Sequence, residues 1–166
     1  MRLYAFLVLA LVGCDDHDQD DHDHDAEVSQ IAIGCEHFMY GPDVPKTATL
    51  DETPGEEATL AAVHQRYVVA LPATEGTEGA RLSFLAMSAG DFYFMLSEDV
   101  PFAVFFEGAE VAATENIAPV ADCAEAAAVH HYDLEPGSYL LRLGPTAVTS
   151  VQLVPHMAGQ DHDHAE

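Results

Sequence analysis

The chain has little positive charge and no tryptophan. Only 5 residues are Lys or Arg against 29 Asp and Glu, which gives a formal net charge of −24 with histidine counted as neutral. Proteins that bind nucleic acid need clustered Lys and Arg to contact phosphates, and electrostatic adsorption to anionic lipid needs them too. The composition therefore argues against nucleic acid as a partner and against membrane binding through surface charge.

The chain also lacks a long hydrophobic run. Its most apolar stretch, residues 3–12, is too short for a transmembrane helix, but it follows Arg2 and fits the apolar part of a secretory signal peptide. The stretch ends in Leu11-Val12-Gly13-Cys14, which resembles the lipobox of bacterial lipoproteins at all four positions. The alternative is an ordinary secretory signal, or a buried apolar segment, with a chance cysteine.

The lipobox resemblance implies a location. By that resemblance, residues 1–13 would be the signal peptide, cleavage would precede Cys14, and acyl chains such as palmitate on Cys14 would hold the mature protein in a lipid bilayer. Two or more acyl chains give durable anchoring. We therefore expect a lipid-anchored protein of the bacterial cell envelope, on the periplasmic face or at the cell surface.

Few cysteines remain once Cys14 is assigned. Cys35 and Cys123 form an even pair in an oxidising compartment, so we expect a disulfide between them. It would close a loop of roughly 90 residues and stabilise the fold by about 4–5 kcal/mol. The alternative is that both thiolates bind a metal ion together with His37, although oxidation competes with such a site.

Two acidic segments, one towards each end of the chain, have no apolar residues to bury. Residues 15–25 read DDHDQDDHDHD, and residues 160–164 repeat the pattern as QDHDH. Such segments cannot offset the entropy cost of ordering. We expect an acidic linker over residues 14–27, one folded domain over 28–157 and a disordered tail over 158–166.

The histidines in these ends are the main chemical feature of the sequence. Neutral imidazole suits Zn²⁺, Cu²⁺ and Ni²⁺, and neighbouring carboxylates add oxygen donors. Zinc is the first choice among these ions, with weak and rapidly exchanging binding. The alternative is an acidic spacer in which the histidines have no role. The candidate ligands in the two ends are His17, His22, His24, His162 and His164.

The domain itself contains a second group of candidates. His37, His64 and His130 would form a three-histidine metal site if the fold brought them together. His130 and His131 cannot share one ion, because adjacent strand residues point to opposite faces. The alternative is that these side chains are hydrogen-bonded structural histidines.

The folded domain has the pattern of an all-β protein. Short apolar or alternating runs separated by turn residues predict a single antiparallel β-sandwich of Greek-key or jelly-roll type. Residues 88–90 (Ser-Ala-Gly) predict a hairpin between two of the runs. The expected strands are residues 63–71, 81–87, 91–96, 101–106, 109–112, 129–134, 138–143 and 148–154.

One local motif supports this architecture. Residues 134–139 (LEPGSY) resemble the tyrosine corner of Greek-key sandwiches such as fibronectin type III domains. The resemblance implies that the Tyr139 hydroxyl bonds to backbone just upstream. The continuation YLLRLGP is similar to the last strands of bacterial prepeptidase C-terminal sandwiches.

The short motifs of the common enzyme classes are missing, including G-x-S-x-G, H-E-x-x-H, the P-loop and G-x-G-x-x-G. We therefore predict a protein that is not an enzyme. The hypothesis is an envelope lipoprotein that buffers or delivers zinc. One alternative is a structural or interaction module that contacts another envelope protein or a glycan. Another is an enzyme whose site follows no short motif.

Overall fold

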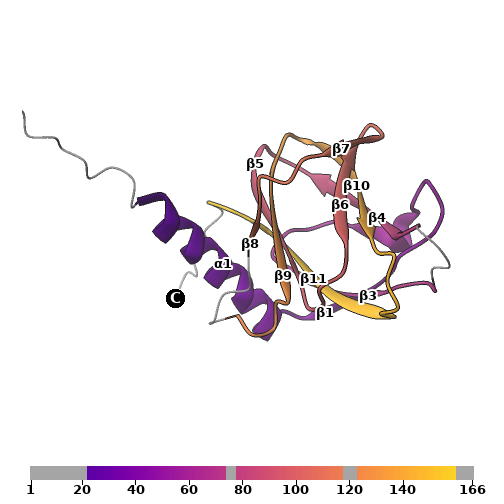
Figure 1. Cartoon of the computed structure of the whole chain (residues 1–166), viewed down its shortest axis with the longest axis horizontal. Helices are drawn as coiled ribbons and strands as arrows, with labels where there is room; N and C mark the ends of the chain where they lie inside the picture. The colour runs from indigo at the N-terminus through magenta and orange to yellow at the C-terminus, as the bar shows by residue number, and fades with distance from the viewer. Residues whose placement is uncertain (1–21, 74–77, 118–122, 160–166) are drawn as a thin grey trace, which may run out of the picture.

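Two β-sheets face each other and one long helix lies against the outside of the first (Figure 1). This computed structural model describes residues 22–73, 78–117 and 123–159. The predicted signal peptide, Cys14, His17, His162 and His164 lie outside the described residues. The prediction of an all-β sandwich is confirmed.

The first sheet, sheet A, has six strands and the second, sheet B, has five. In spatial order, sheet A contains β1 (Asp43–Thr47), β3 (Arg66–Ala70), β11 (Ser150–Met157), β5 (Gly90–Leu96), β9 (Ala128–Leu134) and β8 (Glu115–Ile117). Sheet B contains β2 (Thr59–Leu60), β4 (Ala80–Ala86), β10 (Gly137–Leu143), β6 (Phe102–Phe106) and β7 (Ala109–Val111). A short 3-10 turn, η1 (Glu56–Ala58), precedes β2. The sheets are mostly antiparallel, but β1 pairs with β3 and β2 with β4 in parallel.

The main core lies between the sheets. Phe84 of sheet B packs edge-on against Phe92 and Phe94 of sheet A, with ring centroids 5.6 and 5.2 Å apart. Tyr67 and Leu141 are also fully buried there. Edge-to-face aromatic pairs add to the stabilisation that their buried area provides.

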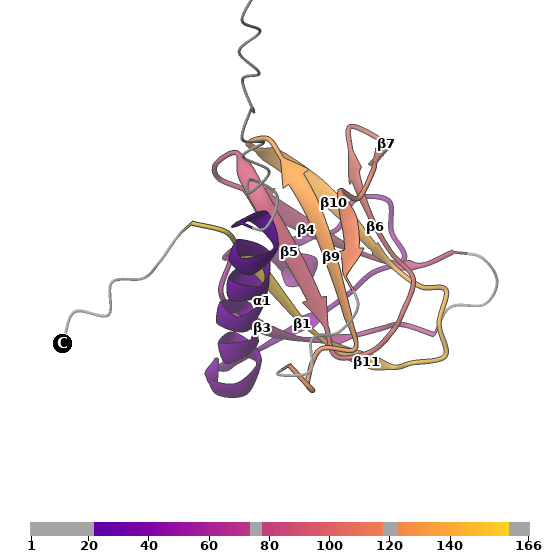
Figure 2. The same cartoon turned by 60° about the vertical axis from the view of Figure 1, so that its left-hand side comes forward.

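A second core lies under the helix. Helix α1 (His22–Tyr40) covers the outer face of sheet A (Figure 2), and its Ile31 and Phe38 pack among Met95, Val129 and Val154. The centre of sheet A, at β5 and the second half of β11, is therefore buried on both faces. This explains the continuous apolar run in β5, which does not alternate as a half-exposed strand does.

The helix corrects the predicted domain boundary. Residues 22–27, expected to end the acidic linker, begin α1, and residues 28–40, expected to open a β-domain, continue it. Asp23 and Asp25 fall in the first turn, where a helix dipole favours negative charge. Ile31 and Phe38 lie seven residues apart, on one face of a helix. Strand-based pattern matching overlooks this short amphipathic face.

The predicted hairpin is wrong. Strands β4 and β5 begin and end near the expected residues, but β4 pairs with β10 and β2 whereas β5 pairs with β11 and β9. The Ser88 region therefore carries the chain from one sheet to the other. Because both faces of β5 are buried, β5 belongs at the centre of sheet A.

Tyrosine hydroxyls fix the loops before two strands. Tyr139 donates a 2.7 Å hydrogen bond to the Glu135 carbonyl, which confirms the bond predicted for the tyrosine corner. Tyr67 makes an unpredicted counterpart in sheet A. Its hydroxyl donates to the Ala62 carbonyl and accepts from the Ala62 N–H, both at 3.0 Å. The loop leading into β3 is thereby held in place.

Candidate metal centre

Three histidines from separate elements meet beneath the end of α1. His37 lies in the last turn of the helix, His64 in the loop before β3, and His156 near the end of β11. One ring nitrogen from each lies within 4.8 Å of the others. The ring centroid of His64 is 4.7 Å from that of His156 and 5.1 Å from that of His37. We call these residues the three-histidine cluster.

His156 forms the floor of the cluster. It lies on the outer face of sheet A and is only 1% exposed, because α1 passes directly above it. Gly34 makes this close approach feasible. A Cβ atom at residue 34 would lie 2.6 Å from Met95 Sδ and 3.3 Å from His156 Cγ. The missing side chain in the helix therefore leaves the space that the buried imidazole occupies.

The backbone of the β3 loop positions His64. Its φ of 58° is in the left-handed region, which residues other than glycine adopt uncommonly. The His64 N–H donates a 2.7 Å hydrogen bond to the Pro155 carbonyl, one residue before His156. Tyr67 anchors the same loop through Ala62. These contacts bring the His64 ring against His156.

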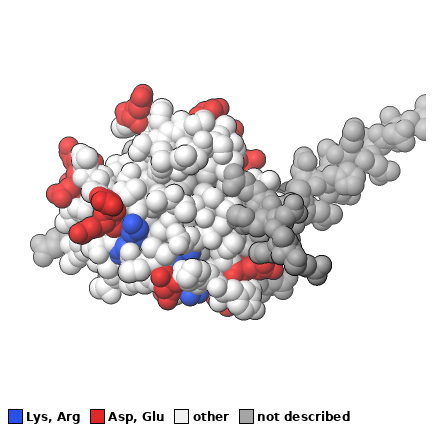
Figure 3. All heavy atoms as spheres, turned by 180° about the vertical axis from the view of Figure 1, so that it is seen from behind, with Lys and Arg blue, Asp and Glu red and all other residues white. Residues whose placement is uncertain are grey.

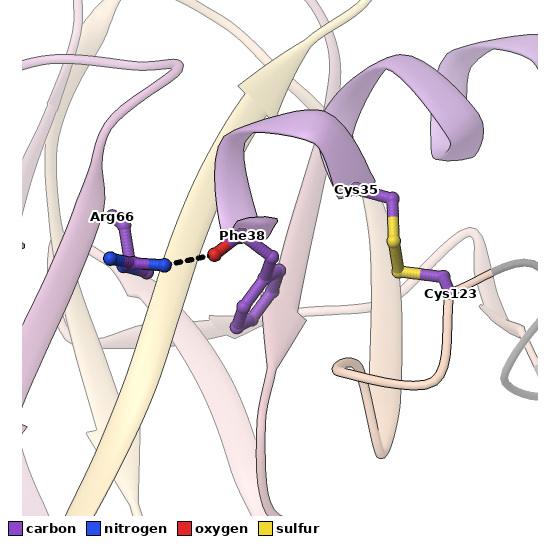
Figure 4. Close-up of a disulfide and its surroundings, with 4 residues drawn as sticks. All are labelled: Cys35, Phe38, Arg66 and Cys123. Carbon is purple, nitrogen blue, oxygen red and sulfur yellow. Dashed lines mark hydrogen bonds between the residues drawn. A yellow bond between two sulfur atoms is a disulfide. The ribbon is translucent and has the colours of Figure 1, made fainter. Parts of the chain in front are cut away.

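Two attachments hold the end of α1 that carries His37 (Figure 4). The predicted disulfide between Cys35 and Cys123 is present and ties the helix to the loop before β9. On the other side, the Arg66 guanidinium donates to the Phe38 carbonyl at the helix end and also bonds Asp43 at 2.6 Å. His37 lies between these two attachments in the sequence.

The hydrogen bonds of His156 define its protonation. Its Nε2 lies 3.1 Å from the Gln30 side-chain oxygen, which can only accept, so Nε2 carries the proton. Nδ1 then accepts a hydrogen bond from His64 Nδ1–H, 2.9 Å away, and a metal ion bound between the two rings would take the place of that proton. Partners such as Gln30 orient the imidazole ligands of metal sites by bonding the second ring nitrogen.

The electrostatics keep this imidazole neutral. Burial, together with repulsion from His64 and His37, lowers the pKa of His156 to about 3. Neutral imidazole is the form that binds transition metals. The buried ring is therefore in its ligand form throughout the neutral and mildly acidic range.

The spacing of the cluster suits a small transition-metal ion. Zn–N bonds of 2.0–2.1 Å in a tetrahedral site place two ligand nitrogens roughly 3.3 Å apart. The closest pair in the cluster is 2.9 Å apart and all three nitrogens lie within 4.8 Å, so shifts of under about 2 Å would suffice. Three nitrogen ligands leave a fourth position for water or another ligand.

His130 does not join the predicted domain site. Its Nδ1 bonds Asn116 Oδ1 at 2.8 Å, and its ring stacks on Phe102 with centroids 5.0 Å apart. Burial lowers its pKa. His130 shares the inner face of β9 with Tyr132, whereas α1 covers the outer face, where His131 stacks on Tyr93. The structure thus brings His37 and His64 together and replaces His130 with His156.

The remaining predicted ligands are placed as follows. Cys35 and Cys123 are joined to each other and do not offer thiolates. The alternative of a metal site on these two cysteines is therefore wrong. His22 and His24 belong to the start of α1, where the backbone alone is described. His156 was missed because it lies in the apolar run VPHM, which reads as an ordinary core strand. A polar residue within such a run was the available signal.

Within the described ranges, no helix is both long and apolar enough to cross a membrane. A comparison with models of known protein families finds no match to this chain, and a comparison with curated proteins finds none either.

Proposed function

We propose that this protein is a bacterial envelope lipoprotein that binds a divalent transition-metal ion at the three-histidine cluster and acts as a metal buffer or delivery accessory. Zn²⁺ is the first candidate, and Cu²⁺ and Ni²⁺ also accept imidazole ligands. The proposed role is not enzymatic.

One observation carries the proposal. Imidazoles from a helix, a loop and a strand converge within 4.8 Å, and Gln30 orients the most buried of them so that its lone pair points into the group. Preorganised ligands avoid much of the ordering cost that a flexible histidine tract incurs on binding. We expect the cluster to bind more tightly than the tails.

The tails would serve the cluster as collectors. The acidic histidine-rich segment runs directly into α1, whose last turn carries His37. Weak sites on His17, His162 and His164, and on His22 and His24 at the start of α1, would raise the local metal concentration around the tethered domain. Acylated Cys14 would keep both at the membrane surface.

Isothermal titration calorimetry with Zn²⁺ tests the site. The cluster variant combines His37→Gln with His64→Asn, since Asn tolerates the left-handed backbone at residue 64. The matched control, His130→Gln with His131→Gln, removes two imidazoles from β9, which β5 separates from β11 in sheet A. We expect one tight equivalent in the wild type and the control, and its loss in the cluster variant.

A third variant separates the cluster from the tails by changing all five tail histidines to Gln. Tight binding that persists in this variant supports the cluster, whereas its loss there would assign the metal to the tails. No heat above the buffer at metal concentrations on the order of tens of micromolar would end the metal proposal. Mass spectrometry of the membrane fraction tests the anchor, and unmodified Cys14 in the mature protein would contradict it.

The alternative is an interaction module whose acidic tails are spacers and whose clustered histidines only fill the second core. Leu85 and Met87, 44% and 78% exposed at the end of β4, favour this function because they offer apolar surface to a partner protein. If the correctly folded protein did not bind metal tightly, the result would support the interaction module and contradict the metal proposal.

A further inference from the structure

A groove of about 500 Å³ lies on the outer face of sheet B. Its floor consists of outward-facing residues of β4, β10 and β6. Its walls are residues 52–54, which precede η1, and the Glu107-Gly108 turn between β6 and β7. Volumes of roughly 300–1,000 Å³ are usual for small-molecule sites.

Two arginines stand side by side in the floor. Arg81 of β4 and Arg142 of β10 are direct cross-strand partners, and both line the groove. They are two of only 5 basic residues in the chain. On the face seen in Figure 3, acidic side chains are widely spread and the few basic ones lie beside them. Like charges directly opposite each other destabilise a sheet, so this pairing carries a cost that an anion would relieve.

The contacts of the two guanidinium groups leave donors for a ligand. Arg81 donates to the Leu50 carbonyl. Arg142 lies 4.7 Å above the Phe105 ring, and its closest carboxylate oxygen, on Glu110, is 4.0 Å away. Each guanidinium has five N–H donors in a planar fork that matches a carboxylate.

The other lining residues define the rest of the ligand. The hydroxyls of Ser83 and Ser138 can donate or accept, and the carboxylates of Glu52 and Glu107 accept from hydroxyl groups and repel a polyanion. Phe105 adds an aromatic surface. The groove is suited to a molecule with a single carboxylate and several hydroxyls.

We propose that this groove binds an acidic saccharide, with the carboxylate of a uronic-acid unit held between Arg81 and Arg142. The sugar hydroxyls bond the serines and the rim glutamates. The site is independent of the three-histidine cluster, which lies on the outer face of the other sheet, so either can fail without the other.

Titration of the purified protein with a disaccharide of one galacturonic acid and one neutral galactose, which carries a single carboxylate, tests the proposal when it is followed by NMR chemical shifts. The neutral galactose oligosaccharide and inorganic phosphate are the comparison ligands. We expect the acidic sugar to bind at least about tenfold more tightly than either, because charged hydrogen bonds and hydroxyl contacts are both required. The shifts should fall on β4, β10 and the Glu107 turn.

Arg142→Gln should weaken binding of the acidic sugar by about tenfold or more. Lys46→Gln is the matched control, because it removes one positive charge from β1 in the other sheet and should leave the affinity unchanged. Arg81→Gln should act like Arg142→Gln, but Arg81 also bonds the Leu50 carbonyl. If Arg81→Gln unfolds, the result for Arg142→Gln alone tests the role of the two arginines.

Several results would overturn the proposal. The proposal is wrong if the acidic sugar does not bind, if the neutral sugar binds equally well, or if phosphate binds more tightly. It is also wrong if Lys46→Gln loses as much affinity as Arg142→Gln. The last would indicate attraction by overall charge alone.

Discussion

The outer faces of the two sheets differ sharply although their inner faces share one apolar core. Helix α1 covers the outer face of sheet A and buries His156 there to 1% exposure. The outer face of sheet B has no such cover among the described residues, and Arg81 and Arg142 lie in an open groove. The same sandwich thus has one dry face and one wet face.

The difference determines which chemistry each face can support. On the dry face a charged group would lack water, so the polar side chain is a neutral imidazole with a lone pair to offer. On the wet face guanidinium groups stay solvated and charged, which suits them to anions. Helix α1 and the attachments that hold it therefore create the contrast between the two outer faces. Changes to the helix or to its attachments should weaken that contrast.

The largest expected effect comes from removing the disulfide. Cys35→Ser combined with Cys123→Ser opens a loop with a sequence separation of 88 residues. The free energy of unfolding should fall by about 4–5 kcal/mol, because the denatured chain regains that loop entropy. Denaturation in guanidinium chloride measures this difference in free energy between the double-serine variant and the disulfide-bonded wild type.

The same variant should lose the proposed metal site but retain the groove on sheet B, since only the metal site depends on α1. An unchanged denaturation midpoint would contradict the role assigned to the disulfide. Equal loss of both sites would mean that the whole sandwich, and not the dry face alone, depends on it.

Acid should destabilise the dry face next most strongly. The pKa of His156 is about 3 in the folded protein and 6.5 in its unperturbed form, so between these values the unfolded chain takes up a proton that the folded protein refuses. The contribution to stability is complete above about pH 6.5. It is lost as the pH falls, by up to about 1.4 kcal/mol per pH unit.

Denaturation of the metal-free protein at pH 6.5 and 4.5 measures this loss, and His156→Gln should show a shallower fall with pH than the wild type. If that variant does not fold, an NMR titration of the wild-type ring serves instead. A His156 resonance that titrates near pH 6 would disprove the neutral buried imidazole.

Filling the space between helix and sheet should have a smaller effect. Gly34→Val places a branched side chain where even a Cβ atom would lie 2.6 Å from Met95 Sδ. Overpacking should cost about 2 kcal/mol and move α1 away from His156. Gly55→Val is the control, because a Cβ atom there has no neighbour within 4 Å. Thermal denaturation compares the two, and equal midpoints would show that the helix has room to move.

The sequence allowed the inner layers of this fold to be predicted well. Alternating and apolar runs located most of the strands, although β1, β2 and β8 were not predicted. The pairing of Cys35 with Cys123 followed from their number and the expected compartment, and Tyr139 was found from its turn. All three signals are local or depend on counting residues. The two-sheet core follows from them because strands with one apolar face must bury it.

The outer faces were harder to predict, because they depend on which element covers which sheet. The hairpin expected at Ser88 and the third ligand expected at His130 both required knowledge of strand partners distant in the sequence. His37 and His64 were recognised as candidates by residue type alone. His156 became visible only when β11 was placed beneath α1, since a buried histidine in an apolar strand looks like core.

The finest comparison uses the two tyrosine hydroxyls, one in each sheet. Tyr139→Phe removes one hydrogen bond, to Glu135, and should cost about 1 kcal/mol of stability without affecting metal binding. Tyr67→Phe removes the two bonds that hold Ala62 in the loop presenting His64, so it should cost somewhat more, roughly 1–3 kcal/mol, and also weaken Zn²⁺ binding. Calorimetric titration of both variants beside the wild type measures this difference. If both lowered the metal affinity equally, the cluster would depend on the sandwich as a whole. A loss confined to Tyr67→Phe would show that the dry face assembles its ligands through its own loop, independently of the wet one.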